Sequence, residues 1–430
     1  MTSSVLILEN ADVVVDGRGL TRCSVVVENG RITGFDGRVS SDGAVERVDL
    51  TGLVVMPGVV DPHLHLGHGK DISRPRAKED AARESAAAAL GGMTTFIPYL
   101  MSTTCYSDLF ADVQAITEAG SRIDFGYHFI ISTEEQLAAV PDYAARYGVR
   151  SYKIFMNNRG GEGTRLGLPD IDDGYLFRLC ETAASVGGVV CPHPENIEIA
   201  FVLRSAYLAR VTDCDLYVVH TSSAAALEAA VLQRQAGTRL MIETCPHYLT
   251  HDETWSGGVV GKINPPLRRS SDCAQLWQAL ADGRIDTVGT DHVHRDLSGK
   301  QGSIWDASPG CPGLETLLPV LLSEGHVKRG LSLERIASLT ATNPARAFGL
   351  GDRKGKIAVG QDADFAIIDP QAEWSVDASR FLSSAGYSIY DGWRLTGRVV
   401  HTVVRGTFVL RDGQLNEQAV GYGRYLPRTA

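Results

Sequence analysis

Between residues 53 and 289 the chain repeats one unit, in which a short apolar run is followed by a polar residue and a stretch of helical character. Eight such runs occur, at residues 53–60, 94–100, 123–131, 151–156, 188–192, 214–219, 239–244 and 285–289. Strand–helix alternation repeated eight times predicts an α/β fold with a parallel sheet closed as a (β/α)8 TIM barrel. An open doubly wound sheet is the alternative, but the chain has no glycine-rich nucleotide fingerprint, which favours the barrel.

The two ends of the chain have a different pattern. Near the N-terminus, runs of β-branched residues are broken by the turn dipeptides Asp16-Gly17 and Asn29-Gly30. Near the C-terminus, short apolar runs separated by glycines cover residues 363–369, 398–405 and 407–411. Both ends are therefore predicted to be all-β.

Composition excludes several classes of protein. With 44% hydrophobic and 21% charged residues, the 430-residue chain has ordinary globular usage and is not a disordered one. A net charge of −10 argues against nucleic acid and anionic membrane as partners. We expect neither a signal peptide nor a transmembrane helix, since the N-terminus lacks a basic region and no apolar run reaches 18 residues. The eight cysteines form no CxxC pair, which argues against a thiolate zinc site and indicates a reducing cytoplasm.

Residue types that bind metals follow five of the eight apolar runs. In a (β/α)8 barrel the active site lies at the carboxyl ends of the strands, so these residues are predicted to meet at one mouth. They are Asp61, His63, His65, Lys153, His193, His220 and Asp291.

The sharpest local signal is the sequence Asp61-Pro62-His63-Leu64-His65. Residues two apart on a strand share a face, so both imidazoles are expected to point into the barrel mouth and to bind one ion. Zinc accepts such nitrogen ligands together with carboxylate oxygens. The alternative is a pair of hydrogen-bonded core histidines, and the further ligand types at other strand ends favour the metal.

Lys153 and Asp291 each allow two interpretations. Lys153 lies in an apolar run, where it is either a lysine whose stem is buried and whose head reaches solvent, or a neutral amine carbamylated by carbon dioxide that bridges two metals. The neighbouring ligand types favour the carbamate. Asp291 suits a metal ligand that also accepts the proton of a nucleophilic water, and a lone aspartate in this position would otherwise be a helix cap.

The chain resembles the cyclic amidohydrolases of the amidohydrolase superfamily, which include dihydropyrimidinases (hydantoinases), allantoinases and dihydroorotases. The matching segments come in the family's order and span nearly the whole chain. They include PGVVDPHLH at 57–65, GGMTT at 91–95, YKIF at 152–155, HPEN at 193–196, HTSS at 220–223, ETCPHYL at 243–249, PPLR at 265–268, TDH at 290–292, GLE at 313–315, TNPA at 342–345 and GKIAVGQDAD at 355–364.

The resemblance implies two divalent metal ions, with zinc as the first expectation. His63, His65 and Asp291 would hold one ion, His193 and His220 would hold the other, and carbamylated Lys153 with a hydroxide would bridge them. The hydroxide would attack a ring amide carbonyl, and Asp291 would pass its proton to the leaving nitrogen, giving an N-carbamoyl product from a hydantoin or dihydropyrimidine ring. The family also implies one small β-sandwich from residues 1–55 and 352–430, a catalytic barrel over residues 56–351, and a homo-oligomer, either a tetramer or a dimer.

Three residues near the expected substrate differ from those of hydantoinases. Asn158 stands where hydantoinases carry a tyrosine that assists the oxyanion; its amide could donate the same hydrogen bond, or residues 157–161 could be a turn-rich loop. Asn264 precedes a proline pair, as in dihydroorotases. Pro309 stands where hydantoinases often have an asparagine, and it has no N–H to offer the ring. We expect Asn264 and Pro309 to contact the substrate and Asn158 to assist catalysis.

The segment between His193 and His220 is shorter than in hydantoinases, at 27 positions (220 minus 193). This length suggests an open mouth and a substrate bulkier than dihydrouracil. Allantoin is the next candidate ring and dihydroorotate follows it, although no arginine follows His65 to hold a carboxylate. Two other classes stay open: a non-catalytic structural or signalling relative, and a mononuclear deaminase of the same superfamily. The six expected metal ligands argue against the first, and Lys153 argues against the second.

Overall fold

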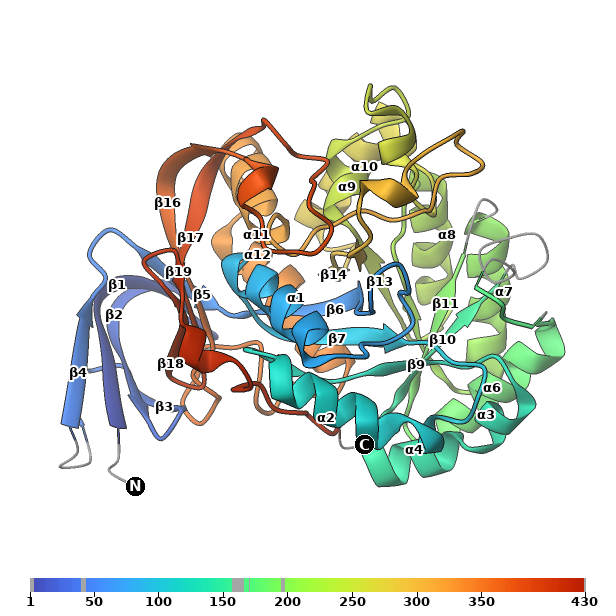
Figure 1. Cartoon of the computed structure of the whole chain (residues 1–430), viewed down its shortest axis with the longest axis horizontal. Coiled ribbons are helices and arrows are strands. Elements are labelled where there is room, and N and C mark those ends of the chain that lie inside the picture. The colour runs from blue at the N-terminus through green and yellow to red at the C-terminus, as the bar shows by residue number, and fades with distance from the viewer. Residues whose placement is uncertain (1–3, 40–43, 157–165, 170, 195–197, 429–430) are drawn as a thin grey trace.

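The computed structural model describes residues 4–39, 44–156, 166–169, 171–194 and 198–428. Within these ranges the strands form two sheets, and Figure 1 shows them side by side. One sheet is the barrel, and the other is built from both ends of the chain. None of the described helices is both long and apolar enough to cross a membrane.

The barrel sheet follows the predicted order of the apolar runs. Its strands are β6 (Val59–His65), β7 (Met93–Leu100), β8 (Asp124–Phe125), β9 (His128–Ile130), β10 (Ser151–Phe155), β11 (Val189–His193), β12 (Asp215–Val218), β13 (Leu240–Thr244), β14 (Thr287–Val288) and β15 (His292–Val293). Neighbouring strands pair in parallel from β6 round to β14. The ring closes because β15, which three residues separate from β14, pairs with β6 and sets His292 opposite Leu64. The predicted barrel is confirmed.

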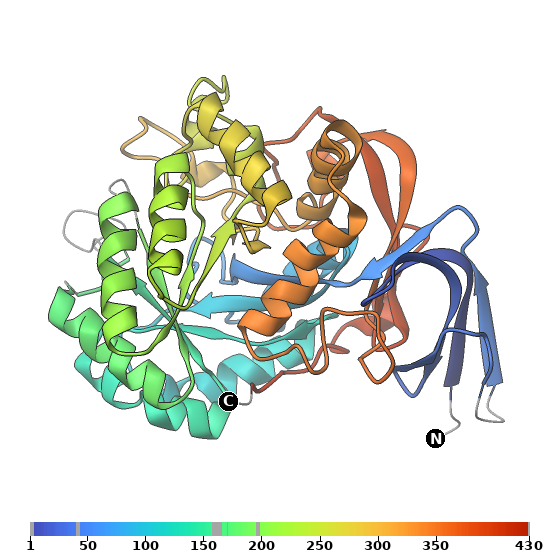
Figure 2. The same ribbon diagram turned by 180° about the vertical axis from the view of Figure 1, so that it is seen from behind.

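Helices cover the outer face of the barrel, as Figure 2 shows from behind. The described α-helices are α1 (Lys78–Leu90), α2 (Phe110–Gly120), α3 (Glu134–Ala138), α4 (Val140–Tyr147), α6 (Asp173–Ser185), α7 (Glu198–Val211), α8 (Ala224–Gln235), α9 (Pro246–Thr250), α10 (Ser270–Asp282), α11 (Leu317–Val320), α12 (Leu333–Ala337) and α13 (Asn343–Ala347). Two π-helical stretches follow α11 and α12, at Leu321–Val327 and Ser338–Thr342. Short 3-10 turns lie at Tyr106–Asp108, Gly258–Gly261, Leu297–Gly299, Ala378–Arg380 and Glu417–Ala419.

The second sheet joins the two ends of the chain. Its strands are β1 (Ser4–Val15), β2 (Gly19–Glu28), β3 (Arg31–Gly34), β4 (Ala44–Asp49), β5 (Val54–Pro57), β16 (Phe365–Ser375), β17 (Arg394–Val404), β18 (Thr407–Arg411) and β19 (Gln414–Leu415). β5 pairs with β16, which brings the N-terminal and C-terminal strands into one mixed sheet. Strand β1 pairs with β4 along its first part and with β5 further on. The predicted all-β ends are therefore present as one sheet; the domain boundaries at residues 55/56 and 351/352 stay a prediction.

The turn chemistry agrees with the expected hairpins. Asn29 and Gly30 connect β2 to β3 with φ angles of 54° and 78°, and Gly17 has a φ of 71° between β1 and β2. One predicted strand is wrong in its extent. Residues 53–60 do not form a single barrel strand, because they divide at Gly58 into β5 of the terminal sheet and β6 of the barrel.

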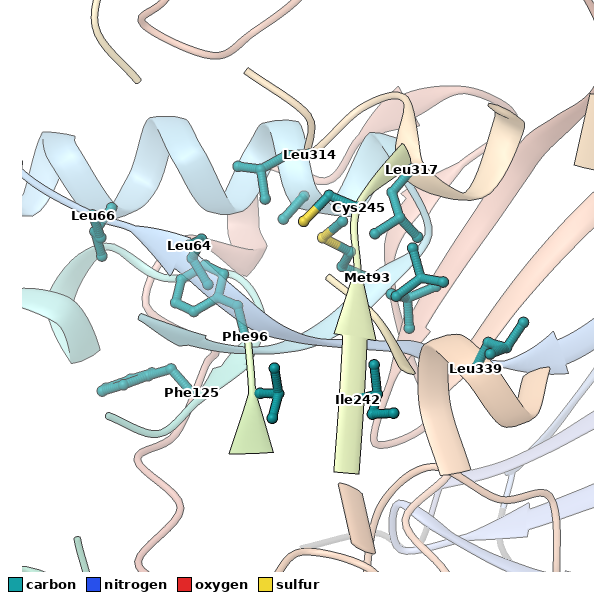
Figure 3. Packing of buried hydrophobic residues seen from close by; sticks show 14 of the residues in the cluster. Leu64, Leu66, Met93, Phe96, Phe125, Ile242, Cys245, Leu314, Leu317 and Leu339 are labelled. Carbon is teal, nitrogen blue, oxygen red and sulfur yellow. The ribbon is translucent and has the colours of Figure 1, made fainter. Parts of the chain in front are cut away.

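The main core lies between the barrel strands and the surrounding helices. Figure 3 shows Leu64 of β6 and Phe96 of β7 in this layer, and both are fully buried. Because successive side chains of a strand point to opposite faces, the outward position of Leu64 turns its neighbours His63 and His65 toward the barrel interior.

Candidate metal centre

The six residues expected to bind metal come from five places around the barrel mouth. His63 and His65 belong to β6, Lys153 to β10 and His193 to the last position of β11, while His220 follows β12 and Asp291 lies between β14 and β15. All six are buried, with at most 7% of each residue exposed. His220 and Asp291 have positive φ angles of 38° and 48°, a conformation that L-residues adopt at a cost and that is frequent at functional sites.

His63, His65 and Asp291 form the first ligand group. Asp291 Oδ1 lies 3.2 Å from His63 Nε2 and 4.0 Å from His65 Nε2. One ligand atom from each of the three residues lies within 4.8 Å of the others, so together they could hold a metal ion. Two imidazole nitrogens and a carboxylate oxygen are ligands that zinc and other borderline divalent ions accept.

His193 and His220 form the second ligand group, beside the first. The distance from His193 Nδ1 to His220 Nε2 is 2.7 Å, and the ring centres of His220 and His63 lie 5.2 Å apart. Lys153 Nζ lies 3.0 Å from His63 Nε2, so the lysine head reaches the first group. The structure thus brings together the six residues that the sequence singled out.

The protonation state of the histidines suits metal binding. Burial lowers the pKa of His63, His65, His193 and His220 well below its ordinary value, and nearby positive charge, including that of Lys153, adds to the effect. The imidazoles are therefore neutral at pH 7, and each has a lone pair to donate. The donor set and its charge state fit divalent metal ions.

A family model described as the amidohydrolase family matches residues 54–409. The chain belongs to this family. It is 30% identical to a D-hydantoinase of Geobacillus stearothermophilus, with 96% of this chain and 95% of the relative covered. It is 33% identical to an allantoinase of Solibacter usitatus (95% and 94% covered) and 31% identical to an L-hydantoinase of Paenarthrobacter aurescens (96% of each).

Solved structures agree with this assignment over the whole chain. A crystal structure of a D-hydantoinase superposes with a TM-score of 0.89 at 29% identity, and a dihydropyrimidinase from Brevibacillus agri with 0.88 at 26% identity. Each comparison covers 99% of both chains. Within its family the chain is therefore a cyclic amidohydrolase, a hydrolase of C–N bonds in cyclic amides.

A pocket opens beside the ligand groups of this amidohydrolase. Asn264 and Pro309, both predicted to contact substrate, line the pocket together with His65, Lys153, His193 and Asp291. Its other lining residues are Ile72, Phe155, Val293 and Gly310. These apolar walls were not predicted, although Phe155 lies two positions beyond Lys153 and so on the same strand face. Asn158 lies outside the described residues, and its role stays a prediction.

A buried aspartate supports the first ligand group from behind. Asp61 accepts hydrogen bonds from the backbone N–H groups of His63 (3.2 Å) and Thr290 (3.1 Å), and from the Thr290 hydroxyl (2.6 Å). Burial raises the pKa of Asp61 to about 7, despite these hydrogen bonds. Asp61 therefore holds Thr290, the residue that precedes Asp291, in place.

Three other histidines near the barrel contact groups outside the two ligand sets. His128 Nε2 contacts the backbone carbonyl of Pro62 (2.9 Å) inside the barrel, as expected of a core histidine. His292 faces α1, where its Nε2 lies 3.1 Å from a carboxylate oxygen of Glu84. His68 is exposed and pairs with Asp80.

Proposed function

We propose that this amidohydrolase opens a cyclic amide of the hydantoin or dihydropyrimidine type by hydrolysis and releases an N-carbamoyl product. The observation that carries the proposal is the meeting of two ligand groups at one barrel mouth, with the buried Lys153 head 3.0 Å from His63. The similarity to D- and L-hydantoinases over nearly the full chain supports the ring type.

The proposed cofactor is a pair of divalent metal ions, with zinc as the first expectation from the ligand types. His63, His65 and Asp291 would hold one ion, and His193 and His220 the other. A carbamate on Lys153 would bridge them. Bound metals supply an activated water nucleophile and polarise the substrate carbonyl.

The chain's own residues would then move the proton and hold the ring. Asp291 lines the pocket and lies next to His63, so its carboxylate is placed to take a proton from the attacking water and deliver it to the leaving ring nitrogen. Asn264 and Pro309 would border the substrate ring, and Asn158 would assist at the oxyanion. The apolar walls at Ile72, Phe155 and Val293 would exclude water around it.

Allantoin is the second candidate substrate. The allantoinase of Solibacter usitatus is as similar to the chain as the hydantoinases are, at 33% identity. Dihydroorotate stays the third candidate: Asn264, which precedes a proline pair as in dihydroorotases, lines the pocket, but no arginine follows His65 to hold a carboxylate. The hypothesis of a bulkier ring, which rests on the short segment between His193 and His220, stays a prediction.

A hydrolysis panel tests the proposed function. The protein is loaded with zinc and bicarbonate and offered hydantoin, phenylhydantoin, dihydrouracil, allantoin and dihydroorotate, and the ring-opened product is measured. We expect turnover of hydantoin, phenylhydantoin or dihydrouracil. In the Asp291→Asn variant we expect the rate of hydrolysis to fall by at least about a hundredfold. Turnover of allantoin alone would select the second candidate. Inactivity on all five rings with two metals bound would overturn the proposed substrate class.

We also propose a homo-oligomer, a dimer or a tetramer, in the cytoplasm. Four apolar side chains at every fourth position of α7 are exposed: Ile199 (43%), Leu203 (40%), Tyr207 (55%) and Val211 (52%). They lie on one face of the helix, and an apolar face can pack on its symmetry copy. The eight free thiols support a reducing compartment.

A further inference from the structure

Glu243 is a buried carboxylate that touches both ligand groups. It is the fourth residue of β13 and is fully buried. Its Oε1 lies 2.6 Å from His63 Nδ1 and also accepts a hydrogen bond from the backbone N–H of His220 at 2.9 Å. Its Oε2 accepts a hydrogen bond from the Tyr217 hydroxyl at 2.9 Å. One carboxylate oxygen thus contacts a ligand of each group.

We propose that Glu243 is a positioning residue that sets the spacing between the two metal ions by holding His63 and His220 in fixed relation. The inference rests on the proposed function, because it takes both ligand groups to bind metal. Glu243 itself touches neither the pocket nor, in this assignment, a metal.

The contact with His63 fixes the orientation of the first ligand. His63 Nε2 faces Asp291 and Lys153, so its Nδ1 is the nitrogen left to carry the proton. A carboxylate at Nδ1 accepts that proton, selects the tautomer with a free Nε2 lone pair and makes this nitrogen a stronger donor.

The contact with His220 fixes the second ligand through its backbone. His220 has a positive φ of 38°, which a non-glycine residue keeps only when its surroundings hold it. Glu243 supplies this restraint twice, since its side chain accepts the N–H of His220 and its backbone carbonyl accepts the N–H of Thr221 at 2.8 Å.

The close approach of Glu243 and His63 depends on a glycine. A Cβ atom at Gly289 would lie 2.9 Å from Glu243 Oε2 and 3.0 Å from His63 Cβ. Any side chain there would push the pair apart, so residue 289 provides the space in which the pair fits.

The negative charge of Glu243 also favours the presence of metal cations nearby. The hydrogen-bond partners of its carboxylate among the described residues are an imidazole, a peptide N–H and a phenol. A buried carboxylate with such partners is costly in free energy, whereas beside two divalent cations its negative charge is compensated. Glu315 is a matched comparison: it is a buried carboxylate that accepts the N–H groups of Leu382 and Ser383 and contacts none of the six ligands.

Metal binding tests the inference without any substrate. Competition with a chromophoric chelator measures the zinc affinity of the unmodified chain and of three variants, Glu243→Gln, Glu243→Ala and Glu315→Gln. The absorption spectrum of the cobalt-loaded proteins reports ligand geometry. We expect a roughly tenfold weaker zinc affinity in Glu243→Gln and up to about a hundredfold in Glu243→Ala, with a changed cobalt spectrum. Glu315→Gln should keep both properties of the unmodified chain.

The isosteric Glu243→Gln variant keeps the test valid if the alanine variant fails to fold. Folded Glu243→Gln with unchanged zinc affinity and an unchanged cobalt spectrum would overturn the inference. An unmodified chain that binds fewer than two zinc ions would overturn both the inference and the proposed metal pair. If two ions bind and Glu243→Gln weakens them, but no cyclic amide is hydrolysed, then the inference stands and only the proposed substrate class fails.

Discussion

Lys153 lies where the two ligand groups meet. Its Nζ is 3.0 Å from His63 Nε2 and 4.3 Å from the ring centre of Tyr99, in a site that leaves only 1% of the residue exposed. A short side chain at this position would remove the proposed bridging carbamate and leave His193 and His220, among the described residues, as the proposed protein ligands of the second ion.

We therefore expect Lys153→Ala to bind one metal or none per chain and to lose at least about a hundredfold in kcat. Added acetate or propionate should restore part of the metal content and activity, since a small carboxylate can fill the space of the carbamate. Metal analysis and turnover with and without the acid check this. Full activity of Lys153→Ala without added acid would contradict the bridging role.

At the residue scale, strand alternation made the clustering of the candidate ligands predictable. His63 and His65 follow a two-residue period, Lys153 lies within a strand, and His193, His220 and Asp291 lie at or just beyond strand ends, so local sequence was sufficient to find them. Glu243 was recognised only as part of a motif. Its partner His63 is 180 positions away, and a hydrogen bond across the barrel leaves no periodic signal in the sequence.

At the scale of elements, the junction between the two sheets depends on Gly58. This single residue separates β5 of the terminal sheet from β6 of the barrel, and its N–H donates to the carbonyl of Asp364 at 3.0 Å. A Cβ atom at Gly58 would lie 2.3 Å from two side-chain atoms of Thr94 in β7. The sequence showed one apolar run here, because β5 and β6 are both apolar although they belong to different sheets.

Replacing Gly58 with alanine should push β6 away from β7 at the base of the strand that carries two ligands. We expect Gly58→Ala to lower the free energy of unfolding by about 1–3 kcal/mol. Urea unfolding followed by circular dichroism measures the change. Gly34→Ala is the control, because a Cβ there would meet its nearest atom at 3.6 Å. Equal midpoints for both variants would show that the junction has room for a methyl group.

At the scale of the whole molecule, ionic contacts fasten the barrel to the terminal sheet. Lys354 Nζ lies 2.6 Å from a carboxylate oxygen of both Asp124 in β8 and Asp364 beside β16, and all three residues are buried. Asp124 also pairs with Arg405 of the turn after β17. The segment at 355–364 was visible as a motif, but Lys354 and Asp124 are 230 positions apart, so their pairing could not be predicted.

The exposed face of α7 makes the oligomer testable. Figure 1 shows α7 at the edge of the barrel opposite the terminal sheet. If this face packs on a second copy, Leu203→Glu and Tyr207→Glu should each place a charge in the interface and lower the mass measured by light scattering after gel filtration. Val359→Glu, at an apolar residue that is 62% exposed in another part of the chain, should keep the original mass. Unchanged mass in all three variants would exclude α7 from the interface.

Burial of histidines makes the metal-free protein sensitive to acid. Burial is the largest cause of a lowered pKa in nine of them: His63, His65, His128, His193, His220, His247, His251, His294 and His401. Burial acts in the opposite sense on six carboxyls: it raises the pKa values of Asp61 and Glu243 to about 7, and it also raises those of Glu198, Asp286, Glu315 and Asp364. Below pH 6.5 the unfolded chain therefore gains protons on nine imidazoles, which outnumber the six carboxyls whose raised pKa values act in the opposite sense.

Because the unfolded chain binds more protons in this range, the free energy of unfolding should fall as the pH falls from about 6.5 to about 5. We expect the Tm of the chelator-treated protein to decrease steadily over this interval and to change less between pH 7 and 8. Calorimetric scans at half-unit steps of pH measure the trend. A Tm that stays level or rises on acidification would mean that the buried histidines take up protons in the folded chain, and that the ligand groups are more open to water than their burial indicates.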